Sequence, residues 1–331
     1  MVVTDTVIYG ARSGIQKAIR RGEPTLAKTC FDILWDVPAH KKWLLWRLPV
    51  LVFEDCWTMA GELAEVQQSV RSLSDSDKKK EWLKFLIRLT IANKNQDASH
   101  LWYLALHGGM DFDHKEYGLM ESLAEKAGRS KPDKIPYFVV MDFLKNETGI
   151  ELGEYEEAAC KTIDARRTSG GMVSDQWNAL AAILLVHTRR LPKEEILQML
   201  DKQKQVYKDE KIGKLSALPI YCFDMHTRPG MLAKRVFLKN HKTKLMFDED
   251  HLDTLWFQAE SAMIGTRVKP PHSVLSKNSR PSWKESMWEE SKLESLARWY
   301  GVSISEMLKH WEQNRQKMFD IVEWAIKKQE K

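Results

Sequence analysis

The sequence lacks closely paired cysteines. Its four cysteines are far apart, and none belongs to a CxxC pair: Cys30, Cys56, Cys160 and Cys222. We therefore do not expect a zinc site built on paired cysteines, and reduced thiols are the plain interpretation.

A nucleotide-binding glycine motif and a long apolar run are also missing. There is no GxxxxGK[ST] motif, since Gly213-Lys214 is followed by Leu215 and lacks the preceding glycine. The most apolar run, residues 43–57, contains Arg47 and Pro49 and is too short to span a bilayer. The N-terminal residues have neither the basic start nor the apolar run of a signal peptide. We expect a cytoplasmic protein without ATPase activity or a membrane partner.

What the sequence does contain is enough apolar material for a substantial core. Its 331 residues suffice for one large or two modest domains, with 43% hydrophobic and 29% charged residues. Thirteen tryptophans suit a core and also offer flat faces on which bases stack. A net charge of +5 permits an anionic partner without requiring one.

Apolar residues recur at helical spacing along the chain, and no segment alternates as a strand would. The fold class that we expect is all-α, a multi-helix, bundle-like body with a C-terminal helical appendage. The domains would be 1–270 as the main body, 271–286 as a linker, and 287–331 as a C-terminal helical pair. Helices are expected over 11–22, 25–36, 37–57, 81–93, 97–107, 119–127, 135–146, 154–168, 174–190, 193–207 and 246–265, with a basic helix after Gly230.

Several local signals support these helices. Ser13 and Gly22 suit the two ends of the first helix, and Pro49 predicts a bend in the third. Serine and aspartate in 74–80 indicate a helix cap before 81–93. The residues predicted to face inward are Trp82, Phe85, Leu86 and Leu89 in that helix, and Leu252, Leu255, Trp256 and Ala259 in 246–265.

The pattern AIRRG (18–22), an apolar helix and then FEDCW (53–57) resembles a known family. It is similar to the helical collar region of clamp-loader-type AAA+ ATPases, in the replication-associated recombination subfamily. The resemblance covers residues 11–110. It implies an all-helical scaffold associated with DNA, while the missing P-loop means that no ATPase activity carries over.

Residues 215–239 contain the richest cluster of reactive side chains. Asp224 and His226 are the usual proton-transfer groups, and two residues apart in extended chain they would share a face. Arg228 could clamp a phosphate in bidentate fashion, and Gly230 lets a backbone approach closely. The alternative is a buried Asp–Arg pair that ties a loop to a helix.

The motif DMHTRPG (224–230) resembles motifs of helical proteins that accompany DNA-modification and phage-defence systems, some of them glycosylase-like. The leading hypothesis is a hydrolase that excises a modified base from DNA by cleaving the N-glycosidic bond. Asp224 would act at the sugar, His226 in proton transfer or positioning, and Arg228 as the phosphate or base clamp. Such chemistry needs no metal and no organic cofactor.

A non-catalytic DNA-binding or collar-like assembly module is the alternative from another class, and a protein-interaction scaffold is a third. Residues 293–311 resemble a helix-turn-helix, which would place Ser303–Trp311 in a DNA groove, although Glu306 and Glu312 favour a plain helical hairpin. His107, Asp111, Asp113 and His114 fit a polar loop better than a metal site. The predicted DNA contacts are Thr227, Lys234, Arg235, Lys239, Arg189, Arg190, Lys42 and Arg47.

Overall fold

The computed structural model describes residues 3–56, 59–92, 212–241, 249–260 and 300–329, and the single positions 119, 122, 142, 143, 145, 146 and 297. Over these residues the protein is all-α, as predicted, and no β-strand occurs among them. The predicted helices over 97–107, 154–168, 174–190 and 193–207 lie outside the described residues, as does the predicted linker 271–286.

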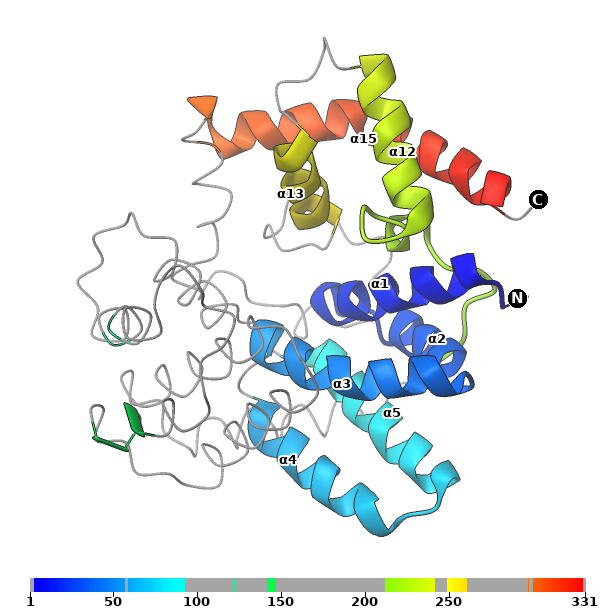
Figure 1. Ribbon diagram of the computed structural model, residues 1–331, viewed down its shortest axis with the longest axis vertical. Helices are drawn as coiled ribbons and strands as arrows, with labels where there is room; N and C mark the ends of the chain where they lie inside the picture. The colour runs from blue at the N-terminus through cyan, green and yellow to red at the C-terminus, as the bar shows by residue number, and fades with distance from the viewer. Residues whose placement is uncertain are drawn as a thin grey trace. The chain divides into compact units, whose positions relative to one another are not determined.

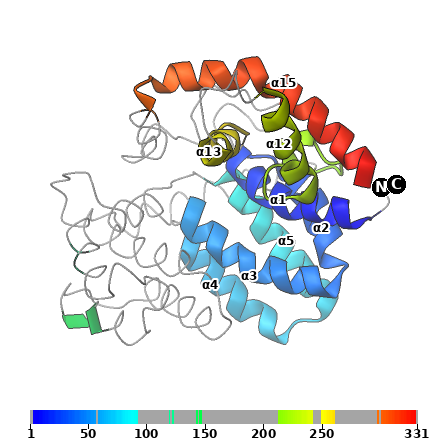
Figure 2. The same ribbon diagram turned by 45° about the horizontal axis from the view of Figure 1, so that its top comes forward.

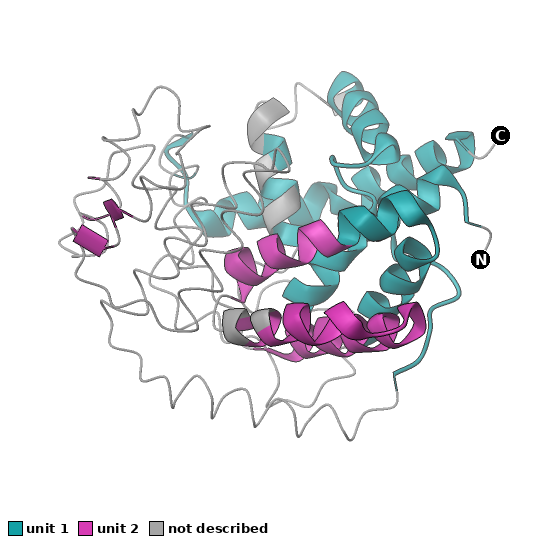
Figure 3. Cartoon of the chain, turned by 60° about the horizontal axis from the view of Figure 1, so that its bottom comes forward, with its two compact units in different colours: residues 1–44, 210–284, 290–331 teal, residues 45–209, 285–289 magenta. Residues whose placement is uncertain are grey.

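The chain divides into two compact units, shown in different colours in Figure 3. One unit comprises residues 1–44, 210–284 and 290–331, and is called unit 1 below. Unit 2 comprises residues 45–209 and 285–289. Unit 1 thus joins the two ends of the chain to the stretch that contains the reactive cluster. The predicted boundaries of a main body and an appendage stay predictions.

Helix α1 (Asp5–Arg21) has buried residues from its first turn to its last. It starts at Thr4, whose hydroxyl accepts a hydrogen bond from the Val7 amide at 3.3 Å, and not at Ser13 as predicted. The helix ends as predicted at Gly22, which has φ 68°. A left-handed backbone conformation at this position favours glycine. The Gly22 amide donates to the carbonyls of Ala18 and Ile19 and so closes the last turn.

Helix α2 (Pro24–Trp35) follows at once and packs against α1, as Figures 1 and 2 show. Pro24 opens it, where a missing amide donor does no harm. Ile15 and Ile19 of α1 and Phe31 and Leu34 of α2 are fully buried. The predicted second helix, 25–36, is therefore confirmed to within one residue at each end.

Helix α3 (Pro38–Asp55) is continuous through Pro49, and the boundary between the two units falls within it. Within unit 2, α4 (Ala60–Ser69) leads through the 3-10 turn η2 (Val70–Ser72) to α5 (Asp75–Ile91). The Ser74 hydroxyl caps α5, so the lysines of 78–80 belong to this helix instead of preceding it. All four predicted inward residues of α5 are buried.

The remaining helices of unit 1 are α12 (Arg228–His241), α13 (Glu249–Glu260) and α15 (Ile304–Gln329). Both α12 and α13 pack against α15 (Figure 1). The four residues predicted to face inward from α13 are all buried. Helix α15 is therefore a structural part of unit 1.

One buried residue, Glu260, connects α13, α15 and α1. The Glu260 carboxylate accepts hydrogen bonds from Trp311 Nε1 at 2.9 Å and from Arg315 Nε and Nη2 at 2.6 and 3.0 Å. The Glu260 main-chain carbonyl accepts a further bond from Arg21 Nη1 at 2.9 Å. The hydrogen bonds to Glu260 raise the pKa of Arg315. A buried carboxylate with this many donors is well satisfied.

The turn predicted before α15 is present. Gly301 has φ 63°, and Ser303 and Glu306 exchange hydrogen bonds as a capping box at the start of α15. However, Trp311 is buried and bonded to Glu260, so it is not available to a DNA groove. The residue pattern predicted the helix start correctly, but the prediction that Trp311 lies in a DNA groove was wrong.

Candidate functional site

The segment between residues 215 and 227 passes over α1 before α12 begins. It contains the short 3-10 turn η4 (Ile220–Cys222), which packs against α1 and α15. Gly10 and Gly14 of α1 make this approach possible, because a Cβ at Gly10 would meet the Phe223 ring at 2.5 Å and one at Gly14 the Cys222 sulfur at 3.1 Å. This close packing fixes the position of Asp224, the first residue of the reactive cluster.

Asp224 is fully buried and forms an ion pair with Lys17 of α1. Lys17 Nζ also donates to Ser13 Oγ at 2.8 Å. Burial by itself raises the pKa of Asp224, but the Lys17 ammonium and the hydrogen bond from His226 outweigh it and hold the pKa well below the usual range. The carboxylate is therefore ionised, already neutralised, and out of contact with solvent.

His226 lies beside Asp224, as the sequence predicted, but in a turn and not in extended chain. Its backbone amide donates to Asp224 Oδ1 at 3.0 Å, and its ring Nδ1 lies 3.3 Å from the same oxygen. The His226 side chain is 62% exposed. Within this cluster, His226 is therefore the proton-transfer group that solvent reaches.

Thr227 and Gly230 start helix α12. The Thr227 hydroxyl accepts from the Gly230 amide at 3.1 Å and donates to the Asp224 carbonyl at 2.8 Å. A Cβ at Gly230 would lie 1.7 Å from that same carbonyl oxygen, so only glycine fits here. Thr227 is buried, and its predicted DNA contact is therefore wrong: the residue is a helix cap.

Arg228 does not pair with Asp224, which corrects the buried Asp–Arg alternative. It is exposed at the first position of α12, and its guanidinium carbon lies 5.6 Å from the centre of the Tyr9 ring. Asp224, His226 and Arg228 thus form no common cavity. The acid faces α1, while the imidazole and the guanidinium face solvent.

The exposed face of α12 is basic. Arg235 and Lys239 are exposed on it together with Arg228, and Met231 lies between them with 43% of its surface exposed. Lys234 lies on the side of the helix and forms an ion pair with Asp253 of α13 at 2.6 Å. Below, "the basic face of α12" means Arg228, Arg235 and Lys239.

The other predicted DNA contacts have varied positions. Lys42 is exposed on α3, in unit 1. Arg47, in unit 2, has its Nη2 3.5 Å from Glu54 Oε2. Arg189 and Arg190 lie outside the described residues, as do His107, Asp111, Asp113 and His114.

Lys17 is the important residue that the sequence reasoning missed. It lies 207 positions from Asp224, and no local pattern connects the two. The only available signal was its place in α1, between the apolar residues Ile15 and Ala18, where a lysine faces the core and needs a counter-ion.

Comparison with protein-family models, curated proteins and solved structures found no match for this chain. Among the described residues there is no group of three or more side chains that would hold a metal ion. No helix in the described part of the chain is long and apolar enough to cross a membrane.

Proposed function

We propose that the protein binds nucleic acid, and specifically DNA, through the basic face of α12. Asp224 then has a structural role and positions the start of that helix. This is the non-catalytic DNA-binding module of the sequence analysis, assigned to a particular helix.

The observation that carries the proposal is the charge of this one surface. Residues 225–247 contain no aspartate or glutamate, and Arg228, Arg235 and Lys239 are exposed. Seven and then four residues separate them, so the three cations follow one side of the helix over about 16 Å. A rigid row of cations suits the regularly spaced phosphates of a nucleic acid strand.

The start of α12 strengthens the positive field. The amides at a helix N-terminus attract anions, and here the turn before the helix presents the exposed His226 instead of a carboxylate. Within the described residues 212–241, Asp224 is the only acid, and it is buried and neutralised by Lys17. The described stretch 212–241 itself therefore presents no exposed acid to an approaching phosphate.

The test is fluorescence anisotropy with a labelled 20-base-pair duplex and the corresponding single strand, titrated at several salt concentrations. The double variant Arg235→Ala/Lys239→Ala should bind about tenfold more weakly near 100 mM salt. Lys317→Ala, an exposed lysine of α15, is the matched control and should bind like the wild type. Equal affinity of the double variant and the wild type would contradict the proposal.

Base excision remains a second proposal, favoured by one contact. The Asp224 carboxylate beside the exposed His226 imidazole is an arrangement that orients a general base. The assay incubates the protein with modified and unmodified duplexes and detects abasic sites. Abasic product that is lost in His226→Ala would support excision. If no duplex that the protein binds gives abasic product, excision is ruled out.

A further inference from the structure

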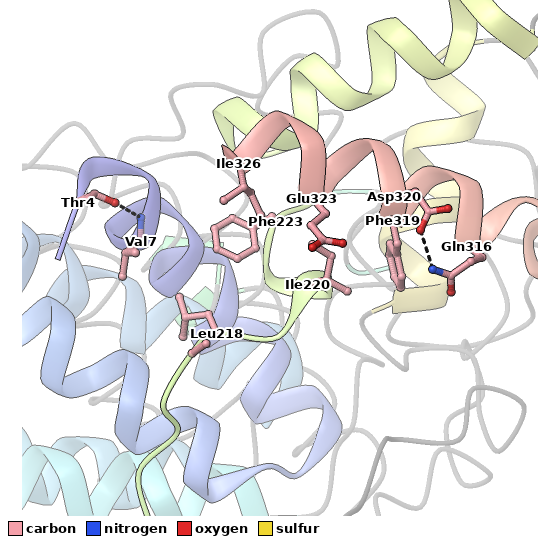
Figure 4. A pocket seen from close by; sticks show the side chains of 11 residues that line it. Thr4, Val7, Leu218, Ile220, Phe223, Gln316, Phe319, Asp320, Glu323 and Ile326 are labelled. Carbon is pink, nitrogen blue, oxygen red and sulfur yellow. Dashed lines mark hydrogen bonds between the residues drawn. The ribbon is translucent and has the colours of Figure 1, made fainter. Parts of the chain in front are cut away.

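A cavity of about 660 Å³ lies in unit 1, away from the basic face of α12. The start of α1, the segment around Phe223 and the second half of α15 line it (Figure 4). Its volume lies in the range of pockets that hold small organic ligands.

Most of the wall is apolar. Val7 of α1, Leu218, Ile220 and Phe223 line it on one side, and Phe319 and Ile326 of α15 line it on the other. The residues of α15 that border the cavity extend from Gln316 to Ile326, which is about 15 Å of helix. The cavity therefore suits an elongated apolar body.

The charged side chains in the described lining of the cavity are all acidic. Among the described residues that line it, Asp320 and Glu323 of α15 are the charged ones, and neither a lysine nor an arginine is present. Both acids are exposed. Gln316 donates to Asp320 at 2.8 Å, and Lys327 lies 2.9 Å from Glu323 in an exposed pair, a type of contact that contributes little. A cationic group at this wall would meet two carboxylates.

We propose that this cavity binds a small organic cation with an elongated apolar body, of the primary alkylamine class. The apolar body would lie between Phe223 and the α15 side chains Phe319 and Ile326. The ammonium group would lie against Asp320 and Glu323. This ligand site is independent of nucleic-acid binding by α12, and each can fail without the other.

The first experiment compares three probes with the same eight-carbon body and different head groups: octylammonium, octanol and octanoate. Binding to the full chain is measured by NMR shift perturbation and isothermal titration, below the concentration at which the probes aggregate. Octylammonium should bind at least tenfold more tightly than octanoate, with octanol between them. Equal affinity for the three, or tighter binding of octanoate, would overturn the proposal.

Variants locate the site. Asp320→Asn/Glu323→Gln should weaken octylammonium binding about tenfold and leave octanol binding unchanged, whereas Glu312→Gln, an exposed acid of α15 outside the cavity, should change neither. Ile326→Trp, which fills the cavity and keeps its charge, should weaken both probes. Thermal unfolding confirms that each variant is folded. If binding survives in both the neutralised and the filled variants, the cavity is not the site.

Discussion

Two groups of residues in the stretch from Asp224 to Lys239 differ in their burial. Asp224 and Thr227 are buried, and each has a hydrogen-bonding or ionic partner that fixes the chain locally. His226, which lies between them, and Arg228, Arg235 and Lys239, which follow, are exposed. The buried residues hold the start of α12 in place, and the exposed residues are what the turn and the helix present to solvent.

This difference shows that richness in reactive groups does not by itself indicate a reaction centre. A buried ion pair is weak support for stability, because desolvation offsets the attraction, but removing one partner leaves a charge without compensation. The predictions below distinguish the buried residues from the exposed ones by the effects of their substitution on folding and on binding.

The largest effect is expected from breaking the buried pair. Asp224→Ala leaves the Lys17 ammonium buried without its counter-ion and should reduce the free energy of unfolding by about 3–5 kcal/mol. Lys17→Met/Asp224→Asn removes both charges, keeps an oxygen for the His226 amide, and should restore most of that loss. Urea denaturation measures both. A double variant no more stable than the single one would show that the pair is not the cause.

A smaller loss is expected at the close approach of α12 to the turn. Gly230→Ala places a methyl group against the Asp224 carbonyl, so the backbone must move, and we expect a loss of about 3 kcal/mol. Gly213→Ala is the matched control, because its Cβ would meet only the Thr25 methyl group at 3.9 Å. Equal stability of the two variants in thermal melts would contradict the described packing.

The acid dependence of stability follows from the lowered pKa of Asp224. A carboxyl whose pKa is lower in the folded state stabilises fully above its unfolded pKa, about 3.9, and loses this contribution as the pH falls through the folded pKa. The stability of the wild type relative to Asp224→Asn should therefore be present at pH 7 and pH 5 and shrink below pH 4. Urea titrations at pH 7, 5, 4 and 3 test this, and a difference that grows towards pH 3 would have the wrong sign.

The sequence predicted the helices where local signals decide them. Gly22 ends α1, Ser74 caps α5, and the spacing of Trp82 and Phe85 identifies a buried face. These features depend on residues a few positions apart, which is the range over which a helix forms. The start of α1 was missed, because Thr4 caps the helix and Ser13 lies within it.

The site was predicted less well, because its partners are distant in the sequence. Proximity to Arg228 suggested an ion pair with Asp224, but the Thr227 cap starts a helix between them and turns Arg228 to solvent. The true partner, Lys17, is brought there by the packing of the 215–227 segment on α1. Arg235 and Lys239 are exposed on α12, and their predicted DNA contacts stay predictions.

The basic face should matter least for folding. Arg235→Ala and Lys239→Ala change exposed side chains on a helix that packs through its other side, so each should alter the unfolding free energy by no more than about 0.5 kcal/mol. Thermal melts measured beside Lys317→Ala test this. A loss as large as that of Gly230→Ala would mean that these residues stabilise the fold.

The salt dependence of DNA binding tests the central claim most directly. The logarithm of the affinity for duplex DNA is plotted against the logarithm of the salt concentration for wild type and for Arg235→Ala/Lys239→Ala. If both cations contact phosphates, the magnitude of the slope should fall by about 1.8 in the double variant, since each contact contributes about 0.9. The same slope for both proteins, or no binding by the wild type at low salt, would contradict the assignment of the basic face of α12 as the nucleic-acid interface.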